Sequence, residues 1–230
     1  MKSIVHGFEI EIERKNVKHL NLRVTAPSGD IKLSVPSLTS LFEIESFVAK
    51  HAEWIEKNQK RFSSAQKQSA FSFRSGELLS LFGQTFSLSV RPSKADAVFF
   101  DGNFLIMNVK DQSAEHCRLI FKEFLKNELE KRLEKFLSEW ENITRLFPVG
   151  YQIKNVKTYW GKCFFQRREL FFSLRLAFCD EECIEYVVLH ELAHLKFPNH
   201  QREFKSFLSK HMPDWKEKQA KLKQTDYYLY

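Results

Sequence analysis

The first 35 residues alternate apolar and polar positions, which is the period-two pattern of β-strands. The segments FEIEIERK and HLNLRVTAPSGDIKLSVP both show this pattern, and PSGD inside the second segment predicts a turn between two strands. After residue 36 the apolar positions recur at three- and four-residue steps. That change predicts one helix over SLTSLFEIESFVAKHAEWIEKNQKRF, capped at its start by Thr39 or Ser40.

The chain then returns to strands and ends in helices. Residues 76–92 and 97–109 have strand character, and DGN in the second segment predicts a turn. A long amphipathic helix is expected from Ser113 to about Asn142, because its apolar residues recur with many charges between them. The remaining expected elements are strands at 151–160 and 169–178 around a turn at 161–168, a helix from Asp180 to Pro198, and short helices at 201–211 and 214–224.

These elements place the chain in the α+β class. We expect a β-rich N-terminal region with one helix at residues 1–110, followed at residues 111–230 by a helical domain with a small sheet. No internal repeat is apparent in the sequence.

The composition is that of a globular protein, since 43% of the 230 residues are hydrophobic and 28% are charged. The N-terminus lacks the apolar core of a signal peptide, and no window reaches the roughly 18 apolar residues of a membrane span. No membrane partner is therefore expected. The formal charge of +7 is compatible with an anionic partner, so nucleic acid is kept as a partner hypothesis. A reduced, cytoplasmic location is expected because four cysteines are too few for a disulfide scaffold: Cys117, Cys163, Cys179 and Cys183.

The segment VVLHELAHLKFPNH holds three of the eight histidines of the chain. His190 and His194 are four residues apart, so on a helix they lie on one face and both imidazoles can reach one metal ion. Zinc in catalytic sites keeps three protein ligands and a water molecule. Glu191 is rotated by about 100° from His190, which lets it contact that water and take its proton as a general base.

His200 is the third ligand that this pattern favours, because a turn containing a proline would return it to the ion. His211, Asp214 and Glu203 are weaker candidates, since each needs a longer return of the chain. The residues on the other side of the helix are apolar and are expected to lie in the core: Ile184, Val188, Leu192 and Leu195.

Two other interpretations of these residues exist. Histidines four residues apart can be ordinary surface or core residues of a helix, although H-E-x-x-H seldom arises by chance. Cys179 and Cys183 also form C-x3-C-x6-H-x3-H with the histidines, a spacing similar to that of a zinc finger. On one helix, however, Cys183 and His190 are about 10 Å apart along the axis, too far for one ion. The two cysteines are therefore expected to be buried apolar residues.

The segment YWGKC, which precedes the strand expected at 169–178, contains further candidates whose roles stay open. Trp160, Gly161, Lys162 and Cys163 lie in it, and glycine usually marks a tight backbone position. A strand edge beside a metal could hold a peptide substrate by β-augmentation. The nearby arginines could bind a carboxylate or an oxyanion, or be merely solvated: Arg167, Arg168 and Arg175.

These segments together resemble a known family. YWGKC, LFFSLRLAF, IEYVVLHELAHLKFPNHQREF and MPDWKEKQAKLK are similar to the C-terminal domain of the YgjP-like metallopeptidases, distant relatives of the SprT-like and WLM zinc peptidases. The likeness extends over nearly the whole chain. It implies a zincin-like domain that binds zinc through His190, His194 and His200, with Glu191 as the catalytic residue. It also implies the SprT-like arrangement, in which a third histidine followed a few residues later by a phenylalanine closes the site; here these residues are His200 and Phe204.

The chain departs from the family pattern at three places. The family usually reads R-W-G-S-C, where this chain has Tyr159 and Lys162 in place of the arginine and the serine. It usually has asparagine and tryptophan in the next strand, where this chain reads LFFSLRL, and F-W after the third ligand, where this chain has Phe204 and Lys205. The implied metal ligands are unchanged, so we expect differences in substrate contacts only.

The sequence therefore predicts a cytosolic zinc metallopeptidase, a hydrolase that acts on peptide or protein substrates. One alternative is a nucleic-acid-associated SprT-like protein that acts on DNA-bound proteins, which salt-dependent binding to DNA or RNA would favour. Another is a non-catalytic, zinc-stabilised binding module, which a fourth protein ligand would favour. The sequence identifies no substrate-binding residue.

Overall fold

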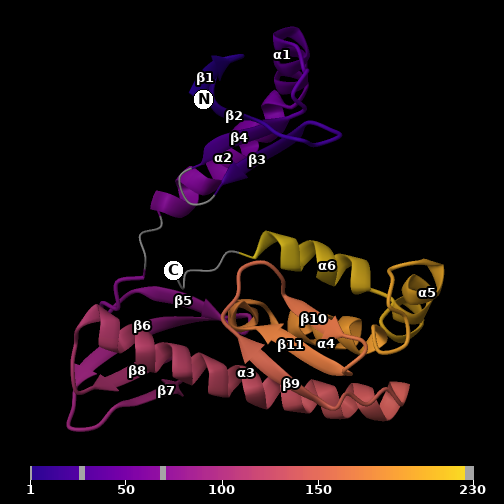
Figure 1. The fold of residues 1–230 in the computed structure, drawn as a ribbon. Coiled ribbons are helices and arrows are strands. Elements are labelled where there is room, and N and C mark those ends of the chain that lie inside the picture. Colours follow the sequence, from indigo (N-terminus) through magenta and orange to yellow (C-terminus); the bar gives the residue numbers. More distant parts are fainter. Residues whose placement is uncertain (1, 26–28, 68–70, 226–230) are drawn as a thin grey trace. The chain divides into compact units, whose positions relative to one another are not determined.

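The computed structural model describes residues 2–25, 29–67 and 71–225 (Figure 1). The chain has mixed α+β structure, as predicted, and divides into two compact units, residues 1–71 and 72–229. From the sequence, the boundary is expected near residue 110 instead. The strand Ala97–Asp101 contacts the long helix that follows it, and residues 72–109 belong with the second unit, a tertiary relation that strand periodicity does not report.

The first unit packs two helices on one face of a mixed sheet. The buried residues alternate along the strands, as Ile31, Leu33 and Val35 do, and they form one core with Ile44 and Ile55 of the helices. The predicted strands are confirmed here, although the turn expected at PSGD lies partly outside the described residues. The strands, in the sheet order β1-β2-β4-β3, are β1 (Lys2–Val5), β2 (Phe8–Arg14), β4 (Asp30–Val35) and β3 (Asn21–Thr25).

The single helix expected after residue 36 is two helices, α1 (Leu41–Lys50) and α2 (Ala52–Lys67). Ser40 caps α1 as predicted, since its hydroxyl accepts a hydrogen bond from the N–H of Glu43 and the Glu43 carboxylate accepts one from the N–H of Ser40. The break falls at His51, the C-cap of α1. Apolar spacing continues across the break, so it does not reveal the end of the first helix.

The second unit begins with a sheet that repeats the topology of the first. In both sheets the two inner strands are parallel and each outer strand is antiparallel to its neighbour. The first hairpins also match, because positive φ angles occur at His6 and Gly7 in one and at Phe82 and Gly83 in the other. The structure thus contains a topological repeat that is not apparent in the sequence. The strands of the second sheet, in spatial order, are β5 (Leu78–Leu81), β6 (Gln84–Pro92), β8 (Phe104–Val109) and β7 (Ala97–Asp101).

The long predicted helix is confirmed as α3 (Ala114–Thr144), which runs along the second unit (Figure 1). It packs against α4 (Glu181–Ala193) and presents a buried row that includes Phe121, Leu125 and Leu129. No described helix, α3 included, has the long apolar stretch that crossing a membrane requires.

A small third sheet follows α3, with the strand order β10-β11-β9. It contains β9 (Gly150–Lys154), β10 (Gly161–Phe164) and β11 (Glu169–Ser173). Three details differ from the sequence prediction. The strand expected at 151–160 ends at Lys154. The segment expected to be a turn at 161–168 supplies β10, and the strand expected at 169–178 ends at Ser173, where the 3-10 helix η1 (Leu174–Phe178) begins.

The C-terminal helices α4, α5 (Arg202–His211) and α6 (Trp215–Gln224) lie close to their predicted positions. The side chain of Asp180, which precedes α4, makes no capping hydrogen bond and pairs instead with Lys221 of α6. The helix ends at Ala193, before Pro198, since the N–H of Leu195 bonds to a carbonyl only three residues back. The predicted apolar stripe is buried: Ile184, Val188, Leu192 and Leu195.

The capping box of α1 provides a test of the first unit. Ser40→Ala removes the acceptor for the N–H of Glu43 and should lower the free energy of unfolding by about 1 kcal/mol. Ser46→Ala, at an exposed position inside the same helix, should leave it unchanged or slightly raised. Urea unfolding followed by circular dichroism measures the free energy of unfolding of both variants. A value for Ser40→Ala equal to that of the wild type would show that the cap does not stabilise the unit.

Candidate metal centre

Three histidines converge at the end of α4. His190 is in the last turn of that helix, His194 is its C-cap, and His200 is in the loop before α5. One ring nitrogen of each lies within 4.8 Å of those of the others, and the Nε2 atoms of His190 and His200 are 3.0 Å apart. The structure therefore assembles the three residues that the sequence predicts as metal ligands.

A chain reversal after α4 returns His200 to the other two histidines. Two backbone N–H groups beyond the helix bond back to the carbonyl of Ala193, which tightens its last turn. Phe204 of α5 is buried beneath the cluster, with its ring centroid 5.0, 4.8 and 4.7 Å from those of His190, His194 and His200. One aromatic ring thus supports all three imidazoles.

Burial keeps two of these imidazoles in the form that binds a metal ion. Burial, together with His194 and His200, lowers the pKa of His190 to about 3. Burial also lowers the pKa of His194, so both rings are neutral at pH 7. The Nδ1 of His194 lies 2.9 Å from the carbonyl oxygen of Phe197. A neutral ring donates Nδ1–H to that oxygen, which leaves the lone pair on Nε2.

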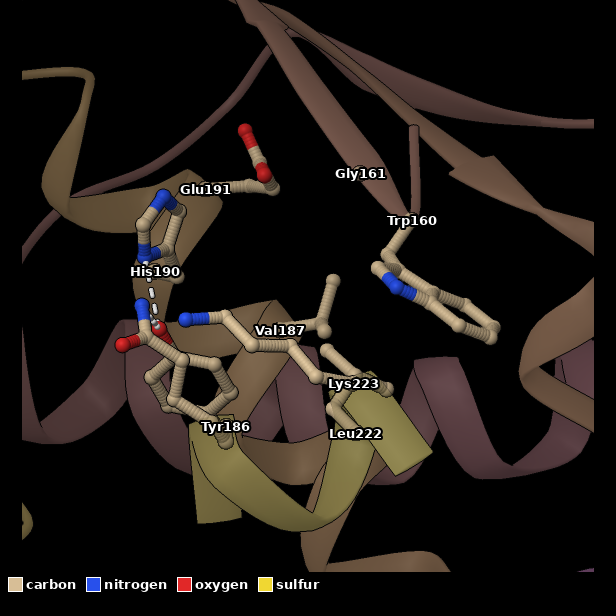
Figure 2. Close-up of a pocket in the computed structure, with 9 residues that line it drawn as sticks. Trp160, Gly161, Tyr186, Val187, His190, Glu191, Leu222 and Lys223 are labelled. Atoms are coloured by element: carbon tan, nitrogen blue, oxygen red, sulfur yellow. Dashed lines mark hydrogen bonds between the residues drawn. The ribbon is translucent and has the colours of Figure 1, made fainter. Parts of the chain in front are cut away.

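Tyr186 and Gln219 surround the other nitrogen of His190. The Tyr186 hydroxyl lies 3.3 Å from Nδ1 of His190 (Figure 2). The Gln219 amide donates to that hydroxyl at 3.1 Å. Such outer contacts fix the orientation and the tautomer of a metal-binding histidine. Neither residue is predicted from the sequence. Tyr186 precedes His190 by four residues, which is a usable signal, whereas Gln219 comes 33 residues after Tyr186 on another helix.

The donor set fits a divalent metal such as zinc. Zinc holds imidazole nitrogens at about 2.0–2.1 Å in a tetrahedral arrangement, which places two ligand nitrogens about 3.3 Å apart. The 3.0 Å between the Nε2 atoms of His190 and His200 is close to that value. Within the described ranges no other His, Cys, Asp or Glu side chain joins the cluster.

The weaker candidates from the sequence lie outside the cluster. His211 packs against Trp140 and Phe207, and Asp214 pairs with Lys218. Glu203 is exposed on α5. The cysteines of the zinc-finger interpretation are buried as predicted: Cys179 and Cys183.

Glu191 lies beside the cluster and against the backbone of β10. Only 5% of its surface is exposed, and this burial raises the pKa of its carboxyl to about 8. A hydrogen bond from the backbone of Cys163 acts in the opposite direction and lowers that pKa. A Cβ atom added to Gly161 would lie 2.6 Å from both Cγ and Oε1 of Glu191. The missing side chain of Gly161 therefore provides the space that the carboxyl occupies.

Two cavities flank Glu191 and share Gly161, His190 and Glu191 as lining residues. The triad cleft has a volume of about 300 Å³, and its other lining residues are Lys162, Cys163, Phe165, His194, Pro198 and His200. The Trp160 pocket has a volume of about 210 Å³ (Figure 2), and its other lining residues are Trp160, Tyr186, Val187, Gln219, Leu222 and Lys223.

A comparison with protein families agrees with this arrangement. The model of a family described as YgjP-like, metallopeptidase domain, matches residues 18–225. The chain belongs to the YgjP-like family. The metallopeptidase domain of this family makes the protein a peptidase, and it implies a catalytic metal.

Solved structures and curated proteins add less to the YgjP-like assignment. The metallopeptidase zymogen of Pyrococcus abyssi abylysin is 23% identical over 39% of this chain and 90% of its own, with a TM-score of 0.37. The zymogen of Methanocaldococcus jannaschii jannalysin is 25% identical over 42% of this chain and 88% of its own, with a TM-score of 0.35. No curated protein matches the chain.

The arginines of this YgjP-like chain lie apart from the two cavities. Arg175 is buried, with its guanidinium carbon 4.0 Å from the ring centroid of Trp160, and it donates to the carbonyl of Lys157. Arg168 donates to the carbonyl of Phe147. These arginines have structural contacts, and neither they nor Arg167 line the triad cleft or the Trp160 pocket.

Proposed function

We propose that the chain is a zinc-dependent peptidase in which His190, His194 and His200 hold the metal and Glu191 is the general base. The observation that carries this proposal is a cluster of three imidazoles beside a buried carboxyl, with no fourth protein ligand in the described part of the chain. Structural zinc sites have four protein ligands, whereas catalytic sites keep one position open. The cluster therefore supports catalysis over a non-catalytic zinc module.

Glu191 is placed to move protons between water and substrate. Zinc bound at the cluster would supply a Lewis acid that polarises a peptide carbonyl and makes a water molecule more acidic. Glu191 takes the proton of the attacking water and passes it to the leaving amine. Burial raises the pKa of this carboxyl to about 8 in the metal-free chain. A dication bound beside it would favour the carboxylate, which is the form that accepts the proton of the water molecule.

The outer strand of the small sheet offers a place for the substrate backbone. β10 pairs with β11 on one side, and Gly161, Lys162 and Cys163 of β10 line the triad cleft. An extended peptide can add to the edge of a strand through backbone hydrogen bonds. A peptide bound in this way would pass along the cleft beside the three histidines and Glu191.

The metal ligands are tested by metal content. His194→Ala removes one of three ligands and should weaken zinc binding by more than about 100-fold, since even residues that only orient a ligand are worth about 10- to 100-fold. Titration with zinc against a competing chelator measures the affinity. His211→Ala is the matched control, because His211 lies outside the cluster, and it should bind zinc as the wild type does. Unchanged affinity in His194→Ala would remove that residue from the ligand set.

The role of Glu191 is tested by a change that keeps its size. Glu191→Gln removes the proton acceptor and should lower kcat for peptide hydrolysis by about 10² to 10⁴-fold while zinc content stays stoichiometric. Glu182→Gln, at an exposed position on the same helix, should retain full activity. Hydrolysis of a quenched fluorescent peptide library measures the rates. Wild-type kcat in Glu191→Gln would rule out the proposed base.

Gly161 is expected to act as a positioning residue for Glu191. Gly161→Ala places a Cβ 2.6 Å from Cγ and Oε1 of Glu191, so the Glu191 side chain must turn away from β10. We expect kcat to fall by about 10²-fold, with zinc content and unfolding midpoint nearly unchanged. Gly150→Ala in β9 is the control, since a Cβ there would have no heavy atom within 4 Å.

A double variant separates positioning from a general structural defect. If Gly161→Ala acts by displacing Glu191, it should cause no further loss of activity in the Glu191→Gln background. An additional loss there, or full activity in the single variant, would contradict the positioning role.

A further inference from the structure

The Trp160 pocket shares His190 and Glu191 with the metal site, but its apolar walls, Trp160, Val187 and Leu222, have no role in metal binding or in the proton transfer proposed above. Its walls come from the start of β10, from α4 and from α6, and Figure 2 shows Trp160, Val187 and Leu222 around it, with His190 and Glu191 at one side. We propose that this pocket binds one apolar side chain of the peptide substrate, next to the bond that is cleaved. This inference rests on the proposed peptidase function and adds a substrate class to it.

Position is the first reason for this assignment. The Trp160 pocket and the triad cleft share Gly161, His190 and Glu191, so only these residues separate them. A peptide that lies along β10 with its scissile bond beside Glu191 has side chains that alternate between its two faces. A side chain adjoining that bond and facing α6 enters the Trp160 pocket.

Size and lining define the chemical class of that side chain. A volume of about 210 Å³ is below the range of about 300–1,000 Å³ that holds drug-sized ligands, so the pocket suits one side chain. Val187 and Leu222 are buried apolar residues of its wall, and Trp160 adds an aromatic surface. Leucine, isoleucine, methionine and phenylalanine match this lining, because they transfer apolar surface from water to apolar walls.

Two further contacts make the pocket selective. The Trp160 ring is held from outside the pocket by the buried guanidinium of Arg175, 4.0 Å from the ring centroid, so this wall is present before a substrate binds. Lys223 is exposed and contributes to the lining from α6. Its ammonium group repels a lysine or arginine side chain, which makes basic residues the least favoured at this position.

The proposal is tested by the residues found beside the cleaved bonds of a peptide library digested by the zinc-loaded full chain. In the wild type, one position next to the cleaved bond should be enriched in leucine, isoleucine, methionine and phenylalanine and depleted in lysine and arginine. Val187→Phe fills the pocket and should shift that position toward glycine and alanine by about tenfold or more, since one methylene in an apolar pocket changes selectivity by about 10- to 200-fold. Leu222→Ala enlarges the pocket and should extend the preference to tryptophan, which keeps the test valid if Val187→Phe does not fold.

The matched control is Val149→Phe, the same substitution at an exposed residue outside both cavities, and it should leave the preference unchanged. A wild type that cleaves without preference at either flanking position would overturn the pocket assignment and leave the peptidase function in place. A folded, zinc-loaded Val187→Phe or Leu222→Ala that keeps the wild-type preference would also overturn the pocket assignment alone.

A binding measurement makes the result independent of hydrolysis. Calorimetry on zinc-loaded Glu191→Gln compares the capped peptide Ala-Ala-Leu-Ala-Ala with the same peptide carrying glycine at its centre. The leucine peptide should bind about tenfold more tightly, and Val187→Phe should abolish the difference. If the wild type cleaves nothing but this difference is present, the peptidase function fails and the pocket assignment stands. Equal binding of the two peptides would overturn the pocket assignment.

Discussion

The packing of three imidazoles on the ring of Phe204 is the contact on which the candidate metal centre depends. His190 and His194 come from α4, His200 comes from the following loop, and Phe204 comes from α5, so the cluster exists only when α5 packs against α4. The buried stripe of α4 fixes the other side of that helix in the core. Packing against Phe204 thus holds the two helix histidines and the loop histidine His200 together, an arrangement that would keep candidate ligands in place before a metal binds.

The helical and strand patterns of the chain were predictable because they are local. Period-two alternation located the strands of the first unit, and the four-residue spacing of His190 and His194 placed both on one side of a helix. His200 could be assigned because only a short turn separates it from α4. The break at His51 and the change from strand to 3-10 helix after Ser173 could not, since apolar spacing continues through both.

The parts of the site that were not predicted come from contacts between distant segments. Gln219 reaches Tyr186 from α6, and Gly161 faces Glu191 from β10, so neither relation has a periodic signal in the sequence. The boundary between the two units differs from the expected one for the same reason. The strand pattern of residues 76–109 would be the same in either unit. Only their packing assigns them to the second unit.

The sheet topology that both units share does not itself form the candidate site. Both units carry the same arrangement of four strands, yet every lining residue of the two cavities lies between Trp160 and Lys223. The four-strand arrangement is therefore not sufficient for the site, which is built from the elements that follow α3. Within those elements, Lys162, which stands where the resemblance to the family leads us to expect a serine, lines the triad cleft beside the three histidines. In the proposed peptidase, a change at the cleft wall would alter contacts with the substrate and leave the reaction itself unchanged, because the wall would contact the peptide while the cluster would act on the bond that is cleaved.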